Sequence, residues 1–362
     1  MVLQFGQPRR ISEAAGCSRR HPAPGVDISH EGAIPSLVEP RWEIFHSNRT
    51  IWAAVLELCD SARTSLSIEQ YIFARSGVGR RLLDVLTAKA RQGVHVRLLV
   101  DAYGSMGLAD SEPAAGLIAA GGEVRSYNRL SGLLTRPVGA LHRLHRKSVI
   151  CDGRWAMIGG TCYHDRMAEW RDTMLRLDGT VAPAAAAAFE ENWRGAEEAL
   201  GGWREGLRLW RYLVNGAPAG GRILRDALLR RIGEAERDVT LTTPYLVPDL
   251  RLLGVLQAAV RRGVRVRLLI PARSDQPVAG FVTRRFAGLL AARGVEAFAY
   301  EPSMMHAKLA VVDGRWALIG SMNLDLLSLH FNQENGVATT SAPLVERLAA
   351  QLEVDFASAS RI

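Results

Sequence analysis

One motif occurs twice in this chain of 362 residues and constrains its fold more than any other feature. Each copy reads His-x-Lys-x4-Asp-x6-Gly, and both copies share the letters DGRWA and a following Ile-Gly pair. The motif residues are His145, Lys147, Asp152 and Gly159 in the first copy, and His306, Lys308, Asp313 and Gly320 in the second. Two copies with the same spacing indicate an internal duplication, so the chain is expected to fold as two related halves.

The residues that follow each lysine predict a buried strand. Ser-Val-Ile-Cys follows Lys147, Leu-Ala-Val-Val follows Lys308, and an Asp-Gly turn comes next in both copies. Side chains alternate between the faces of a strand, so the His and the Lys of each copy project in the same direction. An imidazole beside a fixed positive charge suits a phosphate anion. Ser321 and Asn323, after the second strand, are placed to donate hydrogen bonds to the same oxygens.

A single histidine on a strand is more often structural than catalytic, but the duplication changes that balance. Phosphoryl transfer through a histidine nucleophile needs one neutral imidazole to attack and one imidazolium to protonate the leaving oxygen. The two motif copies supply this pair if they meet where the halves join. We therefore expect His145 and His306 to share one phosphate site.

Strands alternate with helices along the chain, which predicts the α/β class with mainly parallel sheets covered on both faces. We expect a loose lead-in over residues 1–40, a first lobe over 41–200 and a second lobe over 201–362. The expected strands of the first lobe are Trp42–Phe45, Thr64–Phe73, Val94–Asp101, Glu123–Tyr127, the motif strand from His145, and Trp170–Thr173. Its expected helices are Arg49–Ala62, Gly79–Gln92, Pro113–Ala120 and Ala184–Leu200.

The second lobe is expected to repeat this order. A connection over Gly201–Gly221 contains its opening strand, and the elements that follow are a helix at Ile223–Ala235, a strand at Val239–Val247, a helix at Leu250–Arg262 and a strand at Val264–Ile270. RQGVHVRLLV in the first half matches RRGVRVRLLI in the second, and IEQY ending at Tyr71 matches TTPY ending at Tyr245. We therefore predict two lobes related by a pseudo-two-fold axis, with their motif strands facing each other.

The composition favours partners with negative charge but does not choose among the kinds of anionic partner. Lys and Arg outnumber Asp and Glu by 45 to 37, which favours anionic partners such as lipid headgroups, nucleic acid or phosphorylated metabolites. The four cysteines, Cys17, Cys59, Cys151 and Cys162, form no CxxC pattern, and no His, Asp or Glu cluster has metal-ligand spacing. We expect reduced thiols, no metal, and no membrane span, because no apolar run reaches about 18 residues.

The double motif resembles that of the phospholipase D superfamily, and the resemblance covers the chain from about Trp42 onward. Within that superfamily the sequence is most similar to bacterial cardiolipin synthases of the B-type, which lack N-terminal membrane helices. The segments that carry this similarity are IEQYIF at Ile68–Phe73, LHRLHRK at Leu141–Lys147, WRDT at Trp170–Thr173, TTPYLVPD at Thr242–Asp249 and NLDLLSLHFNQEN at Asn323–Asn335.

The resemblance implies transfer of a phosphatidyl group from phosphatidylglycerol to the hydroxyl of a second phospholipid through a phosphohistidine, with neither metal nor cofactor. It also implies anionic phospholipid partners, phosphatidylglycerol and cardiolipin, and no nucleic-acid partner. The protein is expected to be cytoplasmic and peripheral on the cytoplasmic face of the cell membrane. Its oligomeric state is left open.

The resemblance assigns His145 as nucleophile and His306 as general acid and then base, although the residues themselves permit the reverse. Lys147 and Lys308 are expected to bind the non-bridging phosphate oxygens. Asp152 and Asp313 belong to the catalytic motif, but their place before Gly predicts that they hold the turn.

Two further acidic residues occupy equivalent places, since Asp172 lies 20 residues after Asp152 and Glu334 lies 21 after Asp313. We interpret them as partners of the imidazole Nδ1 atoms, and the alternative is a pair of surface salt bridges. The resemblance favours crosswise pairing, Glu334 with His145 and Asp172 with His306.

Glu69, Tyr71 and Tyr245 lie at predicted strand ends, where open α/β sheets place ligands, so they are candidates to line the pocket. Core packing is the alternative for the tyrosines. A lipid substrate also needs an apolar approach. The candidates for this rim are Met304, Met305, Phe281 in the loop after Pro271, Leu326, Leu327 and Leu329.

The first motif copy departs from the second, because it reads Gly-Gly-Thr-Cys where the second reads Gly-Ser-Met-Asn. A thiol is a weak donor, so Cys162 is expected to bind phosphate less well than Asn323 does. Three other functions stay open: a hydrolytic phospholipase D, a nuclease of the same superfamily, which the basic charge favours, and a non-catalytic binder of anionic membranes.

Overall fold

The computed structural model describes residues 39–128, 141–195, 209–216 and 221–362. Three sequence predictions fall wholly or partly outside these ranges. They are the lead-in expected over residues 1–40, of which only 39 and 40 are described, the C-terminal end of the helix expected to reach Leu200 together with the lobe boundary at 200/201, and most of the connection over residues 201–221. Cys17 also lies outside the described residues.

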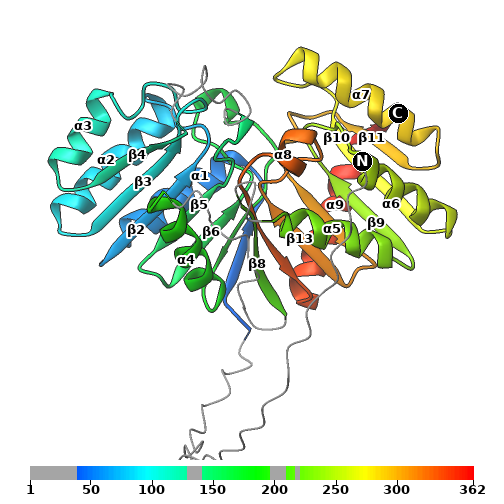
Figure 1. Ribbon diagram of the computed structural model, residues 1–362, viewed down its shortest axis with the longest axis horizontal. Helices are drawn as coiled ribbons and strands as arrows, with labels where there is room; N and C mark the ends of the chain where they lie inside the picture. The colour runs from blue at the N-terminus through cyan, green and yellow to red at the C-terminus, as the bar shows by residue number, and fades with distance from the viewer. Residues whose placement is uncertain (1–38, 129–140, 196–208, 217–220) are drawn as a thin grey trace, which may run out of the picture. The chain divides into compact units, whose positions relative to one another are not determined.

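The first lobe is built on a seven-stranded sheet, shown on the left in Figure 1. In spatial order its strands are β1 (Trp42–Phe45), β7 (Met174–Leu177), β6 (Trp155–Gly159), β5 (Ser148–Cys151), β2 (Ser65–Gln70), β3 (His95–Asp101) and β4 (Glu123–Tyr127). Its helices are α1 (Asn48–Asp60), α2 (Gly77–Arg91), α3 (Glu112–Ala119) and α4 (Val181–Trp193), with a short 3₁₀ turn at Asp165–Met167.

The second lobe repeats this plan on an eight-stranded sheet. Its strands in spatial order are β15 (Ala359–Arg361), β11 (Glu296–Tyr300), β10 (Arg265–Pro271), β9 (Asp238–Thr242), β12 (Leu309–Val312), β13 (Trp316–Gly320), β14 (Glu334–Thr339) and β8 (Trp210–Asn215). Its helices are α5 (Ile223–Glu234), α6 (Leu250–Arg261), α7 (Pro277–Ala291), α8 (Leu326–His330) and α9 (Ala342–Ala357). The α/β class and the duplication are thus confirmed.

The expectation of mainly parallel sheets needs correction. Pairing is parallel between β2, β3 and β4 and between β9, β10 and β11, and the other strand pairs in the described ranges are antiparallel. The reason is local. Asp152 and Gly153 have positive φ angles of 53° and 62°, and Asp313 and Gly314 repeat this with 54° and 61°. These tight turns join β5 to β6 and β12 to β13 as hairpins, which can only be antiparallel.

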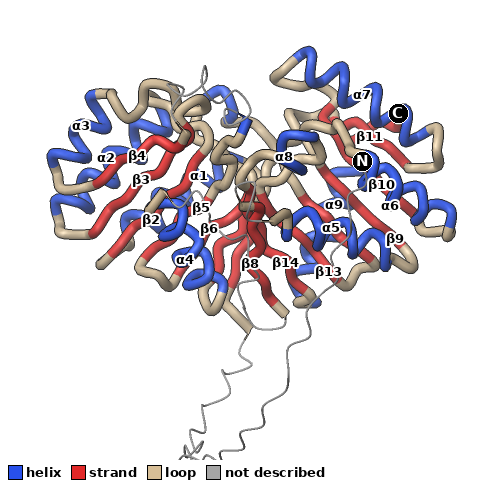
Figure 2. Tube along the Cα trace, viewed as in Figure 1, coloured by secondary structure: helices blue, strands red, loops and turns tan. Residues whose placement is uncertain are grey.

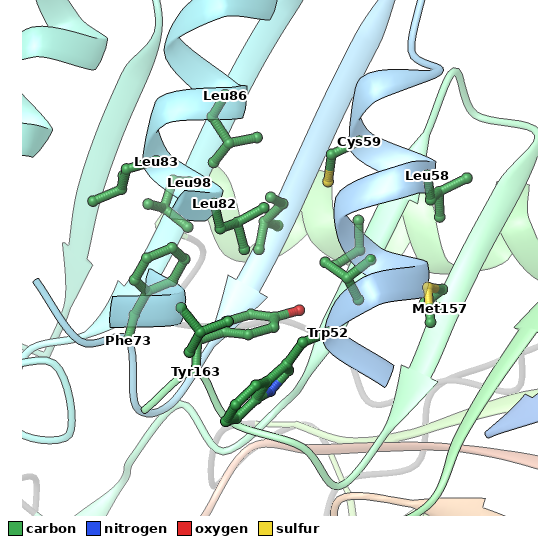
Figure 3. Packing of buried hydrophobic residues seen from close by; sticks show 14 of the residues in the cluster. Trp52, Leu58, Cys59, Phe73, Leu82, Leu83, Leu86, Leu98, Met157 and Tyr163 are labelled. Carbon is green, nitrogen blue, oxygen red and sulfur yellow. The ribbon is translucent and has the colours of Figure 1, made fainter. Parts of the chain in front are cut away.

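Three apolar layers hold the two sheets. On the outer face of the first sheet, Trp52, Leu58 and Cys59 of α1 pack beside Leu82 and Leu86 of α2 (Figure 3). The outer face of the second sheet packs in the same way against α5, α6 and α7. The inner faces of both sheets share a third cluster with α4 and α9, so the two lobes have a common core. Strands covered on both faces carry continuous apolar runs rather than alternating ones, as in β5 and β12.

Several predicted boundaries shift in the structure. The motif strands begin at Ser148 and Leu309, so His145 and His306 lie in extended segments that lead into β5 and β12 rather than on the strands themselves. The stretch Trp170–Thr173 is not a strand but precedes β7. Phe281 was expected in a loop and instead lies in α7.

Candidate active site

The two lobes meet through reciprocal backbone hydrogen bonds beside the motif histidines. The His145 N–H donates to the Gln333 carbonyl at 2.9 Å, and the Gln333 N–H donates to Arg143 at 2.9 Å. In the other direction, the His306 N–H donates to the Arg171 carbonyl at 2.8 Å. Each lobe therefore receives the motif segment of the other in the same way, which agrees with the predicted pseudo-two-fold relation.

Each histidine is paired with a carboxylate from the opposite lobe. Nδ1 of His145 lies 2.9 Å from both carboxylate oxygens of Glu334, and Nδ1 of His306 lies 2.6 Å from Oδ2 of Asp172. Both carboxylates are fully buried. A carboxylate that accepts from Nδ1–H places the lone pair of a neutral imidazole on Nε2, which then becomes the reactive atom. The structure thus brings together the four residues in the crosswise arrangement that the resemblance favoured.

The two lysines lie beside the histidines and are also buried. Nζ of Lys147 donates to the His145 carbonyl at 2.7 Å and lies 5.4 Å from the ring centre of Tyr71. Nζ of Lys308 donates to the His306 carbonyl and lies 2.9 Å from Nδ1 of His306. Two ammonium groups and two imidazoles in a water-poor site offer concentrated positive charge to an anion.

Burial shifts the ionisation of these groups toward their neutral forms. Burial, joined by the charge of Lys308, lowers the pKa of His306 to about 4, although Asp172 opposes the shift. Burial likewise lowers the pKa of His145, against the effect of Glu334. Both imidazoles are therefore mainly neutral at pH 7 in the ligand-free protein. A phosphate anion beside them favours the protonated form, so anion binding is expected to charge one imidazole.

Lys308 gives a testable pH dependence. Burial, joined by the charge of Lys147, lowers the pKa of Lys308 to about 8. The ammonium form therefore dominates below this pH and is lost as the pH rises through it, and the site then loses a cation for the phosphate. We predict that kcat/KM, which reports on free enzyme, falls about tenfold for each pH unit well above 8. Lys308→Arg, which stays charged, should move the fall to higher pH.

The matched control for this profile is Lys89→Arg in α2, where the lysine bonds Gln92 at 3.3 Å. It should leave the alkaline limb at its original pH. A wild-type profile that stays flat from pH 7 to 10 contradicts the assigned role of Lys308.

The residues after each Gly turn differ between the motif copies. Ser321 donates its hydroxyl to Glu334 and accepts from the Asn335 N–H at 3.0 Å. At the corresponding position of the first copy is Gly160, where a Cβ atom would lie only 2.3 Å from Oδ1 of Asp172. The close approach of Asp172 thus requires glycine there, a reason that sequence inspection did not supply.

The positions two residues later also differ. Cys162 and Asn323 are both buried, and burial raises the pKa of the Cys162 thiol. The amide of Asn323 donates to Asp325, and its Oδ1 atom has no protein partner. A neutral thiol adds little hydrogen bonding, so the unequal contribution of the two copies stays our interpretation.

The motif aspartates lie away from the histidines, at the far ends of β5 and β12. Oδ1 of Asp313 accepts from the backbone N–H groups of Arg237 and Asp238 at 2.8 and 3.0 Å. Oδ1 of Asp152 accepts from Thr64 and Ser65 at 2.8 and 2.9 Å. Burial alone would raise the pKa of Asp152, but these backbone donors outweigh it and hold the pKa below its usual range. Both carboxylates fasten the hairpin turn to the start of the neighbouring strand in the sheet, β2 for Asp152 and β9 for Asp313, instead of reaching substrate.

The candidate pocket residues divide into two groups. The ring of Tyr71 contacts His145 edge-on with centres 4.9 Å apart, and the Tyr245 hydroxyl donates to Asp275 at 2.6 Å. Glu69 is instead fully buried. It accepts from Ser148 at 2.9 Å and from Asn192 of α4 at 2.7 Å. Glu69 therefore supports the strand behind Lys147 and does not line the pocket, because strand alternation turns it toward α4.

The expected apolar rim is corrected in part. Met304, Met305 and Leu329 are core residues with almost no exposed surface, since the segment before β12 and one face of α8 pack inward. Phe281, Leu326 and Leu327 are exposed.

Sequence inspection missed the support beneath His306. The indole of Trp170 lies 5.0 Å from the His306 ring centre. Arg171 forms a buried ion pair with Asp355 of α9 at 3.0 and 2.6 Å, and it donates to the Asp172 carbonyl at 2.7 Å. The place of Arg171 beside Asp172 was a usable signal, whereas nothing in the sequence around Asp355 indicates this contact.

Among residues 39–128, 141–195, 209–216 and 221–362, no group of three or more His, Cys, Asp or Glu side chains is arranged to hold a metal ion. None of the helices in these ranges combines the length and apolar content that crossing a bilayer would need.

Comparison with known proteins agrees with this geometry. The family described as "Cardiolipin synthase, PLD-like domain" matches residues 55–193 and 228–358. The probable cardiolipin synthase YwiE of Bacillus subtilis is 31% identical over 318 residues, which make up 83% of this chain but 63% of that protein. This chain therefore spans less than two thirds of the length of that relative. Cardiolipin synthase B of Escherichia coli strain K12 is 32% identical over 314 residues, 82% of this chain and 75% of that protein.

A solved structure gives the same fold at low sequence identity. The phosphatidylserine synthase of Haemophilus influenzae Rd KW20 has a TM-score of 0.73 and 14% identity, and the match covers 89% of this chain and 87% of that one. The family match spans both lobes, and the paired motifs lie within it. The chain belongs to the cardiolipin synthase family of phospholipase D-like proteins.

Proposed function

We propose that this protein is a phosphatidyltransferase that moves a phosphatidyl group from phosphatidylglycerol to the hydroxyl of a second phospholipid. Cardiolipin is the product when the acceptor is also phosphatidylglycerol. One observation carries the proposal: two buried His–carboxylate pairs, each completed across the lobe interface and each beside a buried lysine. Membership of the cardiolipin synthase family supports it.

The reaction proceeds in two steps at one phosphorus atom. Nε2 of His145 attacks phosphorus while the bond from phosphorus to the glycerol oxygen breaks, and His306 gives that oxygen a proton. The acceptor hydroxyl then attacks the phosphohistidine, passes its proton to His306, and releases Nε2 of His145 as the P–N bond breaks. The geometry itself permits the two histidines to exchange roles, and the assignment of His145 rests on family resemblance.

The surrounding residues support each step. Lys147 and Lys308 offset the charge that builds on the non-bridging oxygens. Glu334 and Asp172 fix the imidazole tautomers and stabilise the imidazolium forms. The low pKa of His306 in the ligand-free protein means that it takes up its proton when the anionic substrate binds.

We propose further that the protein meets these substrates as a peripheral protein on the cytoplasmic face of the cell membrane. Both histidines are buried, so a lipid headgroup must enter a narrow site from an adjoining surface. The formal net charge of +8 favours a membrane that contains anionic lipid.

A lipid-product assay tests the proposed reaction. Purified protein is incubated with phosphatidylglycerol vesicles, and cardiolipin and free glycerol are quantified, with phosphatidylcholine vesicles as the control. Transfer yields the two products in equal amounts. Phosphatidic acid in place of cardiolipin identifies a hydrolase instead. If neither phosphatidylglycerol nor phosphatidylcholine is consumed, both transfer and hydrolysis are contradicted.

A further inference from the structure

A group of exposed apolar side chains lies on three helices of the second lobe. They are Leu250 at the start of α6, Val278 and Phe281 in α7, and Leu326 and Leu327 in α8, with exposed fractions of 87, 79, 67, 44 and 46%. We call these five residues the lobe-two rim. Large apolar side chains grouped in this way on a soluble surface mark an interaction site more often than isolated ones do.

Hydrogen bonds to one loop fasten these helices to each other. The loop of residues 243–249 follows β9, and its Leu246 N–H donates to Thr283 of α7 at 3.0 Å. Its Val247 N–H donates to the Leu324 carbonyl just before α8 at 2.9 Å. Nε2 of His330 in α8 lies 2.8 Å from Asp249, which caps α6. The three helices, which are labelled in Figure 2, are thus all bonded to this one loop or to the residues beside it.

The same loop and α8 adjoin the phosphate site. Asn323 of the second motif lies three residues before α8 begins at Leu326. Tyr245 of the loop packs against the cluster of the first lobe that contains Cys162. A headgroup that passes the lobe-two rim therefore arrives beside the residues that follow both motif copies.

The exposed charged side chains around the lobe-two rim are mainly positive. Four exposed arginines flank it, namely Arg251, Arg273, Arg284 and Arg285. No Asp or Glu occurs from Gln276 to Arg293. The acidic residues nearby are engaged inward, since Asp275 accepts from Tyr245 and Asp325 accepts from the Ser328 N–H at 2.8 Å. Apolar side chains surrounded by arginine fit a bilayer surface that carries anionic headgroups.

We infer that the lobe-two rim is the surface by which the protein docks on an anionic bilayer, with Val278 and Phe281 entering the headgroup region and the arginines binding phosphates. This inference rests on the proposed function, because it supplies a route from the bilayer to a buried site. Docking through the second lobe places the mouth of the site against the membrane, so the substrate need not leave it fully.

Vesicle sedimentation tests the docking surface. We expect Val278→Ser combined with Phe281→Ser to lower partitioning onto vesicles of equal parts phosphatidylglycerol and phosphatidylcholine by about tenfold or more. Arg284→Gln combined with Arg285→Gln should weaken binding to these vesicles and flatten its salt dependence. The matched control is Ile118→Ser combined with Val354→Ser, which removes two exposed apolar side chains from α3 and α9 and should bind as wild type does.

A second measurement separates this inference from the proposed reaction. On a short-chain phosphatidylglycerol kept monomeric, the rim variants should turn over at the wild-type rate, while on vesicles their rate should fall with their binding. Equal vesicle binding by wild type and the Val278/Phe281 variant overturns the inference, whatever the activity.

A change from dimer to monomer in that variant, with vesicle binding unchanged, also overturns the inference and identifies the lobe-two rim as a contact between copies of the chain. Rim-dependent binding without cardiolipin formation upholds docking and rejects the reaction.

Discussion

We expect His306→Ala to release nitrophenol from a phosphatidyl p-nitrophenyl ester in a single burst and His145→Ala to release none. Nitrophenolate leaves without protonation, so the first step no longer needs the acid. If His145 is the nucleophile, the His306 variant forms the phosphohistidine and then stalls, because no base activates the acceptor. On phosphatidylglycerol, which needs both groups, each variant should lose about 10⁴-fold or more in kcat. Burst amplitude and mass spectrometry of the His145 peptide provide the measurement.

The outcomes of this experiment are distinct. A burst in His145→Ala and none in His306→Ala reverses the assignment, which the residues allow. A burst in neither variant contradicts a covalent histidine mechanism. The control is His95→Ala, which removes an exposed imidazole that lies 3.2 Å from Glu123 and should keep full turnover.

The sequence indicated the candidate site residues more completely than it indicated the contacts that hold them in place. The duplicated spacing predicted that His145 and His306 meet at one interface, and each motif segment does bond across the contact between the lobes. The matching offsets of Asp172 and Glu334 indicated their presence, but a spacing along the chain cannot tell which histidine each one meets. Their crosswise pairing joins residues 134 and 189 positions apart and came from resemblance alone.

The apolar pattern of the strands does not indicate which of their neighbours are parallel. Strands covered on both faces are apolar throughout, and this pattern is the same for parallel and antiparallel neighbours. The turn between β5 and β6 held the missing information, because Asp-Gly after a buried strand is a hairpin signal. A tight turn of this kind implies that the two strands it joins, β5 with β6 and β12 with β13, pair antiparallel.

The support behind the two motif copies has diverged, which no repeat analysis can anticipate. Behind the first copy, buried Glu69 accepts from Ser148 and Asn192 and lies 3.6 Å from Arg146. At the corresponding register of the second sheet, Thr242 bonds Ala307 and Leu309 at 2.9 and 3.1 Å. An ionic network in one lobe and a hydroxyl in the other do the same task, since both fix the segment that carries the histidine.

Substitution of the two buried carboxylates, Glu334 and Asp172, is expected to have the second large effect on the reaction rate. We expect Glu334→Gln to lower the rate of the nitrophenol burst by about 10³-fold, because an amide that donates to Nδ1 of His145 favours the tautomer with the proton on Nε2. That tautomer has no lone pair for attack. Asp172→Asn should leave the burst nearly unchanged and slow the second step, because His306 acts only there with this ester. Stopped-flow absorbance at the nitrophenolate band resolves the two phases.

The contrast between these variants excludes a merely structural explanation. Both carboxylates are fully buried, so a folding defect would affect both kinetic phases of both variants alike. Asp172 also raises the pKa of His306, so its loss should shift any acidic limb of the second step to lower pH, which a misfolded fraction would not do. Similar losses of the burst in Glu334→Gln and Asp172→Asn would show that the two histidines do not have separate roles. A selective loss of the burst in Glu334→Gln ties attack to the imidazole that this carboxylate orients, which is His145.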